Sequence, residues 1–203
     1  MYVARPSLIA KHYTFENYVD LFTKTEFPRA LLNSLMIAFL TTVCCLLISI
    51  LGSYAMTRLK YPGRRFFKTS IIFSYLIPTA VLFVPMYVFV SKLGFYDNKW
   101  ALLIIYPTTV VPYCCYMLMS YFKAIPYALE EAALIDGCTR MKSLRYIITP
   151  IALPGIAVVA TFAFTMSWNE YLYAMIMTTS PAQQTAVVAI SSFKYADSAI
   201  WGR

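Results

Sequence analysis

The chain has 203 residues, of which 60% are hydrophobic and 13% are charged, and its formal net charge is +8. This composition, with a mean hydropathy of +0.64, is too apolar for an ordinary soluble domain and predicts a membrane protein. The basic residues cluster between apolar segments instead of alternating with aromatic ones, which argues against nucleic-acid binding. Four of the five cysteines form adjacent pairs inside apolar segments, and His12 has no obvious ligand partner, so we expect no metal site.

Four apolar segments are each predicted to cross the membrane as a helix, because about 20 residues span the hydrocarbon. They are residues 30–57, 69–90, 100–122 and 155–177. The segment before them, residues 1–29, is polar and aromatic and lacks the apolar core of a signal peptide. The predicted fold class is therefore all-α, a single polytopic membrane domain preceded by a small surface element.

The loop after the first span determines the predicted orientation. Residues 58–68 contain five basic residues and no acidic residue, which places this loop in the cytoplasm by the positive-inside tendency. The spans then alternate, so that residues 126–154 are also cytoplasmic and residues 1–29 and 178–203 are external. Because both ends of the chain are then outside, we expect a span before residue 1 and another after residue 203.

Prolines interrupt the second and third spans, at Pro78, Pro85, Pro107 and Pro112. Each proline removes a backbone hydrogen bond, and the freed carbonyl needs another partner or a water-lined cavity. Two hypotheses fit these prolines: ordinary kinks in packed helices, or spans that line a path that opens and closes. The prolines by themselves do not separate the two.

Residues 126–154 form the only sizeable run in the second half of the chain in which charged and helix-forming residues outweigh apolar ones. Pro126 suits a first helical turn, and Gly137 suits the left-handed position that ends a helix. Asp136 is predicted to cap a second helix that begins near Cys138. A helix–turn–helix between apolar spans indicates a partner outside the bilayer. The alternative is an amphipathic helix on the inner leaflet, against which two adjacent glutamates argue.

An amide and a carboxylate, Asn169 and Glu170, lie within the fourth predicted span. On a continuous helix that starts at Gly155, Glu170 would lie about 22 Å along the axis, in the outer half of the membrane. Its carboxylate would either reach the outer surface beside Trp168 or Tyr171, or border a polar pathway, since intramembrane charges are costly and often functional. We therefore predict Asn169 and Glu170 as candidate residues of a translocation pathway.

The stretch Glu131-Ala132-Ala133-Leu134-Ile135-Asp136-Gly137, with Ile147-Ile148-Thr149-Pro150 and Pro154-Gly155 after it, resembles the EAA loop of inner-membrane permeases of ATP-binding-cassette importers. Further segments resemble the sugar-transporting branch, in particular the smaller permease of the maltose system: Asn33-Ser34-Leu35, Tyr61-Pro62-Gly63-Arg64 and Ser167-Trp168-Asn169-Glu170-Tyr171. The resemblance covers nearly the whole chain. Such permeases usually have six spans, so we expect this chain to be truncated at both ends.

The resemblance implies a docking site for a cytoplasmic ATPase, made of Glu130, Glu131, Ala132, Ala133, Asp136 and Gly137. In such permeases Glu131 would face basic groups in a groove of the ATPase. Ala132 and Ala133 would allow close approach, and Gly137 would make the turn between two short helices.

The resemblance also implies several partners: a dimer of cytoplasmic ATP-binding subunits, a second homologous permease, an extracytoplasmic substrate-binding protein and the lipid of a bacterial inner membrane. The permease would form half of a translocation pathway for a sugar or related carbohydrate, without catalytic residues or a cofactor of its own. ATP would be bound by the partner subunit, which agrees with the lack of a GxxxxGK[ST] phosphate loop and a GxSxG nucleophile elbow in this sequence. A channel or a membrane-embedded enzyme without ATPase coupling is the alternative.

Overall fold

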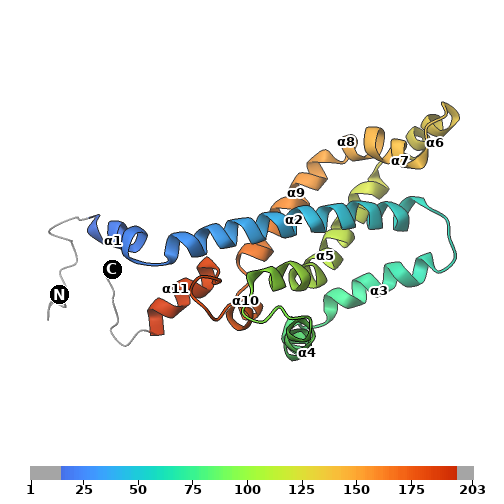
Figure 1. Cartoon of the computed structure of the whole chain (residues 1–203). Helices are drawn as coiled ribbons and strands as arrows, with labels where there is room; N and C mark the ends of the chain where they lie inside the picture. The colour runs from blue at the N-terminus through green and yellow to red at the C-terminus, as the bar shows by residue number, and fades with distance from the viewer. Residues whose placement is uncertain (1–14, 196–203) are drawn as a thin grey trace, which may run out of the picture.

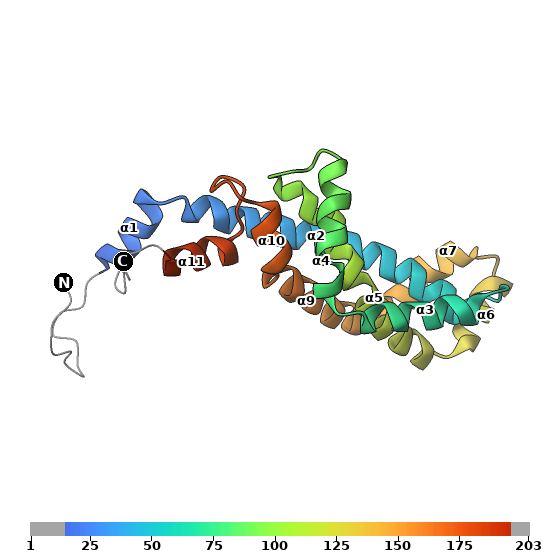
Figure 2. The ribbon, with the colours of Figure 1, turned by 90° about the horizontal axis from the view of Figure 1, so that it is seen from below.

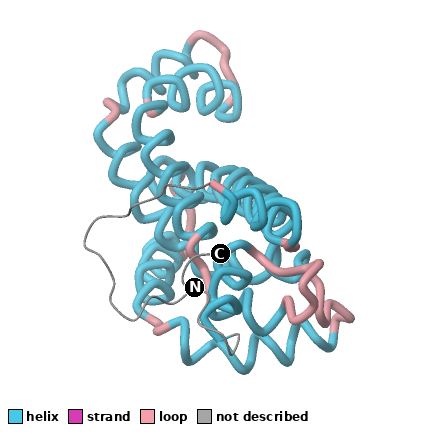
Figure 3. Tube along the Cα trace, turned by 90° about the vertical axis from the view of Figure 1, so that its left-hand side faces the viewer, coloured by secondary structure: helices cyan, strands magenta, loops and turns pink. Residues whose placement is uncertain are grey.

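The computed structural model describes residues 15–195, and every regular element in that range is helical (Figure 3). The elements are α1 (Glu16–Lys24), α2 (Phe27–Arg58), α3 (Arg64–Leu76), α4 (Thr79–Lys92), the 3₁₀ turn η1 (Lys99–Ala101), α5 (Leu102–Ala124), α6 (Tyr127–Ile135), α7 (Arg140–Ser143), the π-helical turn η2 (Leu144–Ile148), α8 (Thr149–Ile151), α9 (Leu153–Trp168), α10 (Leu172–Met177) and α11 (Ala186–Tyr195). The predicted all-α class is confirmed. Residues 1–14 and 196–203 of the two predicted external segments, and with them His12, lie outside the described residues.

The longest helix, α2, runs through the whole molecule, and α5 and α9 pack along it (Figure 1). It has 32 residues, which corresponds to about 48 Å at a rise of about 1.5 Å per residue. The buried face of α2 is made mostly of small and polar side chains, among them Ala30, Asn33, Ser34, Ala38, Thr41, Cys45, Ser49 and Ser53. Its exposed face carries large apolar side chains, among them Leu32, Leu35, Phe39, Leu47 and Leu51. This distribution suits a helix in lipid, where small residues let neighbouring helices approach closely.

Two apolar clusters hold the helices together. The first joins α2, α5, η2 and α9 and includes Cys45, Val110, Leu118, Phe122, Ile148 and Val159. The second joins α2, α4, α5, α10 and α11 and includes Ile37, Val90, Leu102, Tyr106, Tyr173 and Val188. Figures 1 and 2 show α6 and α7 at one end of the molecule and α1 and α11 at the other. We refer to these as the α6 end and the α11 end.

Within the described part of the chain, two helical segments are each long and apolar enough to cross a membrane: Phe27–Arg58 and Lys99–Ala124. Two bent helix pairs bring the number to four if each pair counts as one span, and this number agrees with the prediction of about four. One pair is α3 and α4, which meet at 98° where residues 69–90 were predicted to form one span. Pro78 explains the break, because the residue before a proline is disfavoured in the helical conformation. Pro85 lies inside α4 without ending it. The second pair, Arg140–Ile151 with Leu153–Trp168, begins inside residues 126–154, which were predicted to be a cytoplasmic loop.

The fourth predicted span, residues 155–177, is also not one helix. α9 ends at Trp168 and α10 begins at Leu172, so the placement of Glu170 on an unbroken helix from Gly155 is wrong. The chain at Asn169 and Glu170 is instead a short break between two helices.

Candidate functional site

A hydrogen-bonded turn terminates helix α6 at its C-terminus. Gly137 has a φ of +85°, the left-handed conformation predicted for it. The N–H of Cys138 donates to the carbonyl of Ala133 at 2.9 Å, and the N–H of Gly137 donates to that of Leu134 at 3.2 Å. These two bonds define a Schellman motif. A Cβ on Gly137 would meet nothing within 4 Å, so the backbone conformation, and not a lack of space, requires glycine here.

The second short helix begins later than predicted. Its N-cap is Thr139, whose hydroxyl oxygen accepts a hydrogen bond from the N–H of Lys142 at 3.3 Å. Asp136 caps the C-terminus of α6 instead, so the prediction that it begins the next helix is wrong. The reason is that Asp136 and Gly137 form the Schellman turn that ends α6. The next helix can therefore begin only after this turn, with Thr139 as its N-cap.

A π-helical turn and one sharp bend lie between the helix–turn–helix and α9. In a regular α-helix the ring of Pro150 would collide with the carbonyl of Tyr146, four residues earlier. The wider π-helical turn η2 contains Tyr146 and ends at Ile148, two residues before Pro150, and it accommodates the ring. After α8 the chain bends by 81° into α9. The helix–turn–helix therefore projects beyond the packed part of α2, α5 and α9 (Figure 1).

One face of α6 is exposed and is called here the outer face of α6. It consists of Ala128, Glu131, Ala132 and Ile135. These positions are spaced i, i+3, i+4 and i+7, which places them on one side of a helix. Ile135, at the tip, is 85% exposed. The outer face thus offers two small side chains, one carboxylate and one apolar group.

The opposite face of α6 turns toward the bundle. Glu130 is 4% exposed and Ala133 is 5% exposed. The hydroxyl of Tyr54 donates to Glu130 Oε1 at 2.5 Å, and Nε of Arg58 lies 3.9 Å from Glu130 Oε2. The predicted docking residues are thus divided, with Glu131, Ala132, Asp136 and Gly137 exposed and the other two buried. Tyr54 and Arg58 were not predicted as site residues, and Arg58 was expected only as part of a basic loop, because nothing in the local sequence shows that they meet α6.

The two predicted pathway residues have different roles at the break after α9. Glu170 accepts hydrogen bonds from the N–H groups of Tyr173 (3.1 Å) and Ala174 (3.2 Å), which lie in the first turn of α10. A carboxylate on such otherwise unpaired donors stabilises a helix N-terminus. Asn169 is exposed, and its amide donates to the carbonyl of Thr165 at 3.0 Å, in the last turn of α9. Glu170 therefore holds the start of α10, whereas Asn169 completes the end of α9.

Polar side chains at the α11 end hold the loop between α10 and α11 against α2. The amide of Asn33 donates to the carbonyls of Ala182 (3.1 Å) and Gln184 (3.0 Å). Nζ of Lys99 donates to Oδ1 of Asn33 at 2.7 Å. One amide side chain on α2 thus positions a loop about 150 residues later in the chain, at separations of 149 and 151 residues.

A carboxylate fixes the same loop from the other side. Asp97, which follows α4, accepts hydrogen bonds from the hydroxyl of Ser180 and, at 2.8 Å, from its N–H. These bonds lower the pKa of the Asp97 carboxyl below its ordinary value, because they stabilise the charged form. Asp97 also has a φ of 47°, an unusual conformation for a residue other than glycine.

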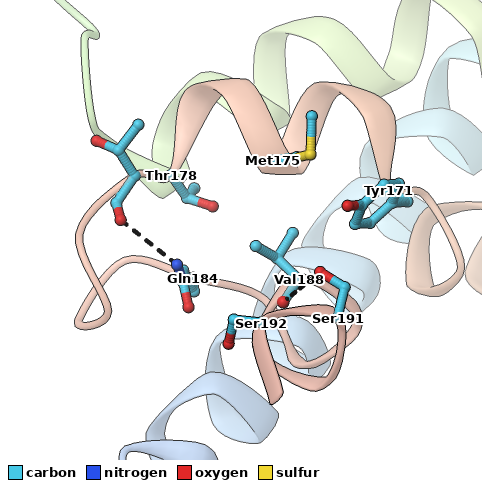
Figure 4. A pocket seen from close by; sticks show the side chains of 8 residues that line it. Tyr171, Met175, Thr178, Gln184, Val188, Ser191 and Ser192 are labelled. Atoms are coloured by element: carbon cyan, nitrogen blue, oxygen red, sulfur yellow. Dashed lines mark hydrogen bonds between the residues drawn. The ribbon is translucent and has the colours of Figure 1, made fainter. Parts of the chain in front are cut away.

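A hollow of about 490 Å³ lies between α10 and α11 (Figure 4). It is lined by Tyr171, Met175, Thr178, Thr179, Gln184, Val188, Ser191 and Ser192. The hydroxyls of Thr178, Ser191 and Ser192 each donate to a backbone carbonyl, so their oxygens are left to accept hydrogen bonds. The cap that Glu170 provides for α10 fixes one wall of this hollow. Within residues 15–195, no three His, Cys, Asp or Glu side chains lie where they could hold a metal ion.

Comparison with known proteins gives consistent results. Residues 48–201 match the family model described as "Binding-protein-dependent transport system inner membrane component". The chain is 35% identical over 200 residues to the inner membrane ABC transporter permease protein YcjP of Escherichia coli, covering 98% of this chain and 71% of that protein. It is 34% identical over 186 residues to the trehalose transport system permease protein SugB of Mycobacterium tuberculosis, covering 92% and 68%.

The fold is also similar to that of a solved structure. A chain in the crystal structure of a bacterial ABC transporter involved in the import of the acidic polysaccharide alginate matches with a TM-score of 0.77 at 23% identity, over 89% of this chain and 62% of that chain. At this identity the likeness concerns the fold alone. The family match and the two relatives show more: the chain belongs to the family of inner-membrane components of binding-protein-dependent transport systems.

Proposed function

We propose that this chain is the permease subunit of an ATP-driven importer and forms half of the translocation pathway for a sugar or related carbohydrate. The observation that carries this proposal is the outer face of α6, which is exposed at one end of the molecule on a helix–turn–helix that projects from the bundle. The trehalose permease among its relatives supports the substrate class. The family description supports the transport role and the inner membrane as its location.

The chemistry of the outer face suits a groove in a cytoplasmic ATPase. Ala128 and Ala132 have short side chains and allow a partner to approach the helix closely. Glu131 lies between them and would pair with basic groups of the groove, and Ile135 would enter an apolar part of it. Asp136 and Gly137 form the turn beside this face. Glu130 and Ala133, which the resemblance also suggested, would support the face from behind.

The other partners follow from the same proposal. ATP would be bound and hydrolysed by a dimer of ATPase subunits, and this chain would contribute no catalytic residue or cofactor. A second homologous permease would complete the pathway, and an external binding protein would deliver the substrate at the α11 end. Glu170 and Asn169, at the break between α9 and α10, are the proposed pathway residues of this chain.

A charge reversal on the outer face tests the proposal. Glu131→Lys should remove the ATPase from the detergent-solubilised complex, because like charges across an interface cost several kcal/mol. Glu26→Lys makes the same change on an exposed side chain near the start of α2, toward the α11 end, and should leave the complex intact. The measurement is the amount of ATPase that co-purifies with the tagged permease at matched membrane expression. A wild-type permease that purifies without an ATPase, or a Glu131→Lys complex of normal composition, would refute the docking role.

A further inference from the structure

Arg58, the last residue of α2, is fully buried and binds the end of α5. Its Nη2 donates to the carbonyls of Phe122 (2.5 Å) and Ile125 (2.6 Å). The last carbonyls of a helix have no partner within the helix, and a cation there satisfies them and complements the helix dipole. One guanidinium thus joins the C-terminal ends of α2 and α5.

The same guanidinium contacts α6. Its Cζ lies 4.1 Å from the centre of the Tyr127 ring, within the range of a cation–π contact. The hydroxyl of Tyr127 in turn donates to the carbonyl of Thr57 at 2.7 Å. The first turn of α6 is therefore attached to the last turn of α2 by two separate contacts.

Glu130 completes this connection from the middle of α6. Its carboxylate lies close to α2 and α7, because Oε1 accepts a hydrogen bond from the Tyr54 hydroxyl at 2.5 Å and lies 4.0 Å from Nη1 of Arg140. A buried carboxylate is costly unless it is paired and hydrogen bonded. These partners account for its burial, and they come from two elements besides α6.

The contact between Glu130 and Arg58 is not fully closed. Nε of Arg58 and Oε2 of Glu130 are 3.9 Å apart, which is too long for a hydrogen bond, and both atoms lack a hydrogen-bond partner among the described residues. The hydrogen bond from Tyr54 is therefore the short contact between Glu130 and α2, and Arg58 adds an ion pair at longer range.

We propose that Glu130 is a positioning residue that transmits displacement of α6 to α2, through Tyr54 and Arg58, instead of contacting the ATPase itself. This inference rests on the proposed function. It divides the two adjacent glutamates into two roles: Glu131 on the outer face binds the partner, and Glu130 on the inner face makes α6 and α2 move as one unit.

Distances between spin labels on α6 and beside α2 test this proposal in the assembled complex. The labels are placed at Lys60 and Leu129, which are both exposed and lie outside the outer face of α6. Cys44 and Cys138 are replaced by alanine, since the remaining three cysteines are buried. The distance is measured with and without a non-hydrolysable ATP analogue, and co-purified ATPase is quantified in the same samples.

In the otherwise unaltered complex the label distance should not change on nucleotide binding, because α6 and α2 move together. In Tyr54→Phe, which removes one hydroxyl, and in Glu130→Gln, the distance should change, while the amount of ATPase stays normal. Tyr146→Phe is the matched control, because it also removes one hydroxyl and Tyr146 is 67% exposed on η2. The label distance in the Tyr146→Phe complex should stay constant on nucleotide binding. In the double variant that combines Tyr54→Phe with Glu130→Gln, the change in label distance should be no larger than in Glu130→Gln alone, because the Tyr54 hydroxyl acts through Glu130.

A constant distance in both variants, or a loss of ATPase from the Tyr54→Phe complex, would overturn the inference. A distance change already present before these substitutions would overturn it as well. A wild-type permease that never retains the ATPase would instead contradict the proposed function, so the two failures are distinguishable.

Discussion

Substituting Gly155 by alanine should disrupt a close contact between α9 and α5. A Cβ on Gly155 would lie 2.4, 2.5 and 2.8 Å from Cγ, Cδ1 and Cδ2 of Tyr121. Carbon atoms in contact are normally about 3.5–4.0 Å apart. The ring would therefore have to move by about 1 Å, and because these atoms are its base and not its tip, α5 would have to move with it.

The size of the effect follows from two opposing terms. Overpacking of this kind costs about 1–3 kcal/mol, and contact with three ring atoms indicates the upper end of that range. Alanine is about 1 kcal/mol more favourable than glycine inside a helix, which offsets part of the cost. The net loss for Gly155→Ala is about 2 kcal/mol, or a fall in Tm of about 4–8 °C for a domain of this size.

The assay is thermal unfolding of the detergent-solubilised complex, followed by the fraction that remains monodisperse. Gly52→Ala is the control, because its Cβ would meet Cys115 Sγ at 3.5 Å and Met56 Cε at 3.7 Å, which are ordinary contacts. Gly52→Ala should leave Tm unchanged or raise it, and Tyr121→Ala should relieve the clash in Gly155→Ala. Equal Tm values for Gly155→Ala and Gly52→Ala would refute the packing argument.

Three further predictions concern orientation, the loop after α10 and the break after α9. In whole cells, a membrane-impermeant thiol reagent should label Asn98→Cys but not Gly63→Cys, and the reverse pattern would overturn the predicted topology. The lowered pKa of Asp97 means that its ionised form is preferred in the fold, so its stabilising effect is full above the ordinary carboxyl pKa and is lost as pH falls through the lowered value. Asp97→Asn should therefore speed proteolysis of the loop at pH 7 but make no difference at strongly acidic pH, and equal rates at pH 7 would contradict this. Glu170→Gln should reduce substrate uptake more than Asn169→Ala at matched expression, because an amide oxygen cannot replace both carboxylate oxygens on α10. Wild-type uptake in both variants would leave neither residue with a role in the pathway.

Local signals were sufficient for several features of this chain. The apolar composition and the length of the segments predicted a helical membrane protein, because these properties depend only on transfer into lipid. The turn at Gly137 was predictable because a left-handed position favours glycine whatever surrounds it. The motif that begins at Glu131 pointed to the same family as the comparisons. None of these conclusions depends on contacts between residues that are far apart in the chain.

Helix boundaries show where local signals end. The start of the second short helix was misplaced because both Asp136 and Thr139 are good cap residues, and the two bonds of the Schellman turn decide between them. The break at Glu170 was missed because the apolar residues on both sides of it predict one continuous helix. The Glu170 carboxylate stabilises the break by accepting hydrogen bonds from the N–H groups of Tyr173 and Ala174, and these groups lack a helical partner only once the helix has been interrupted.

The division of labour between Glu130 and Glu131 was decided by the tertiary structure. Adjacent residues on a helix point about 100° apart, so the sequence by itself established that the two glutamates face different directions. Which of them faces the bundle depends on Tyr54 and Arg58, which lie 76 and 72 positions earlier in the chain and are brought to α6 by the packing of α2 against α5. The sequence around a charged side chain does not show which distant residues will cover and pair with it. Only the packing of the helices brings those residues to it.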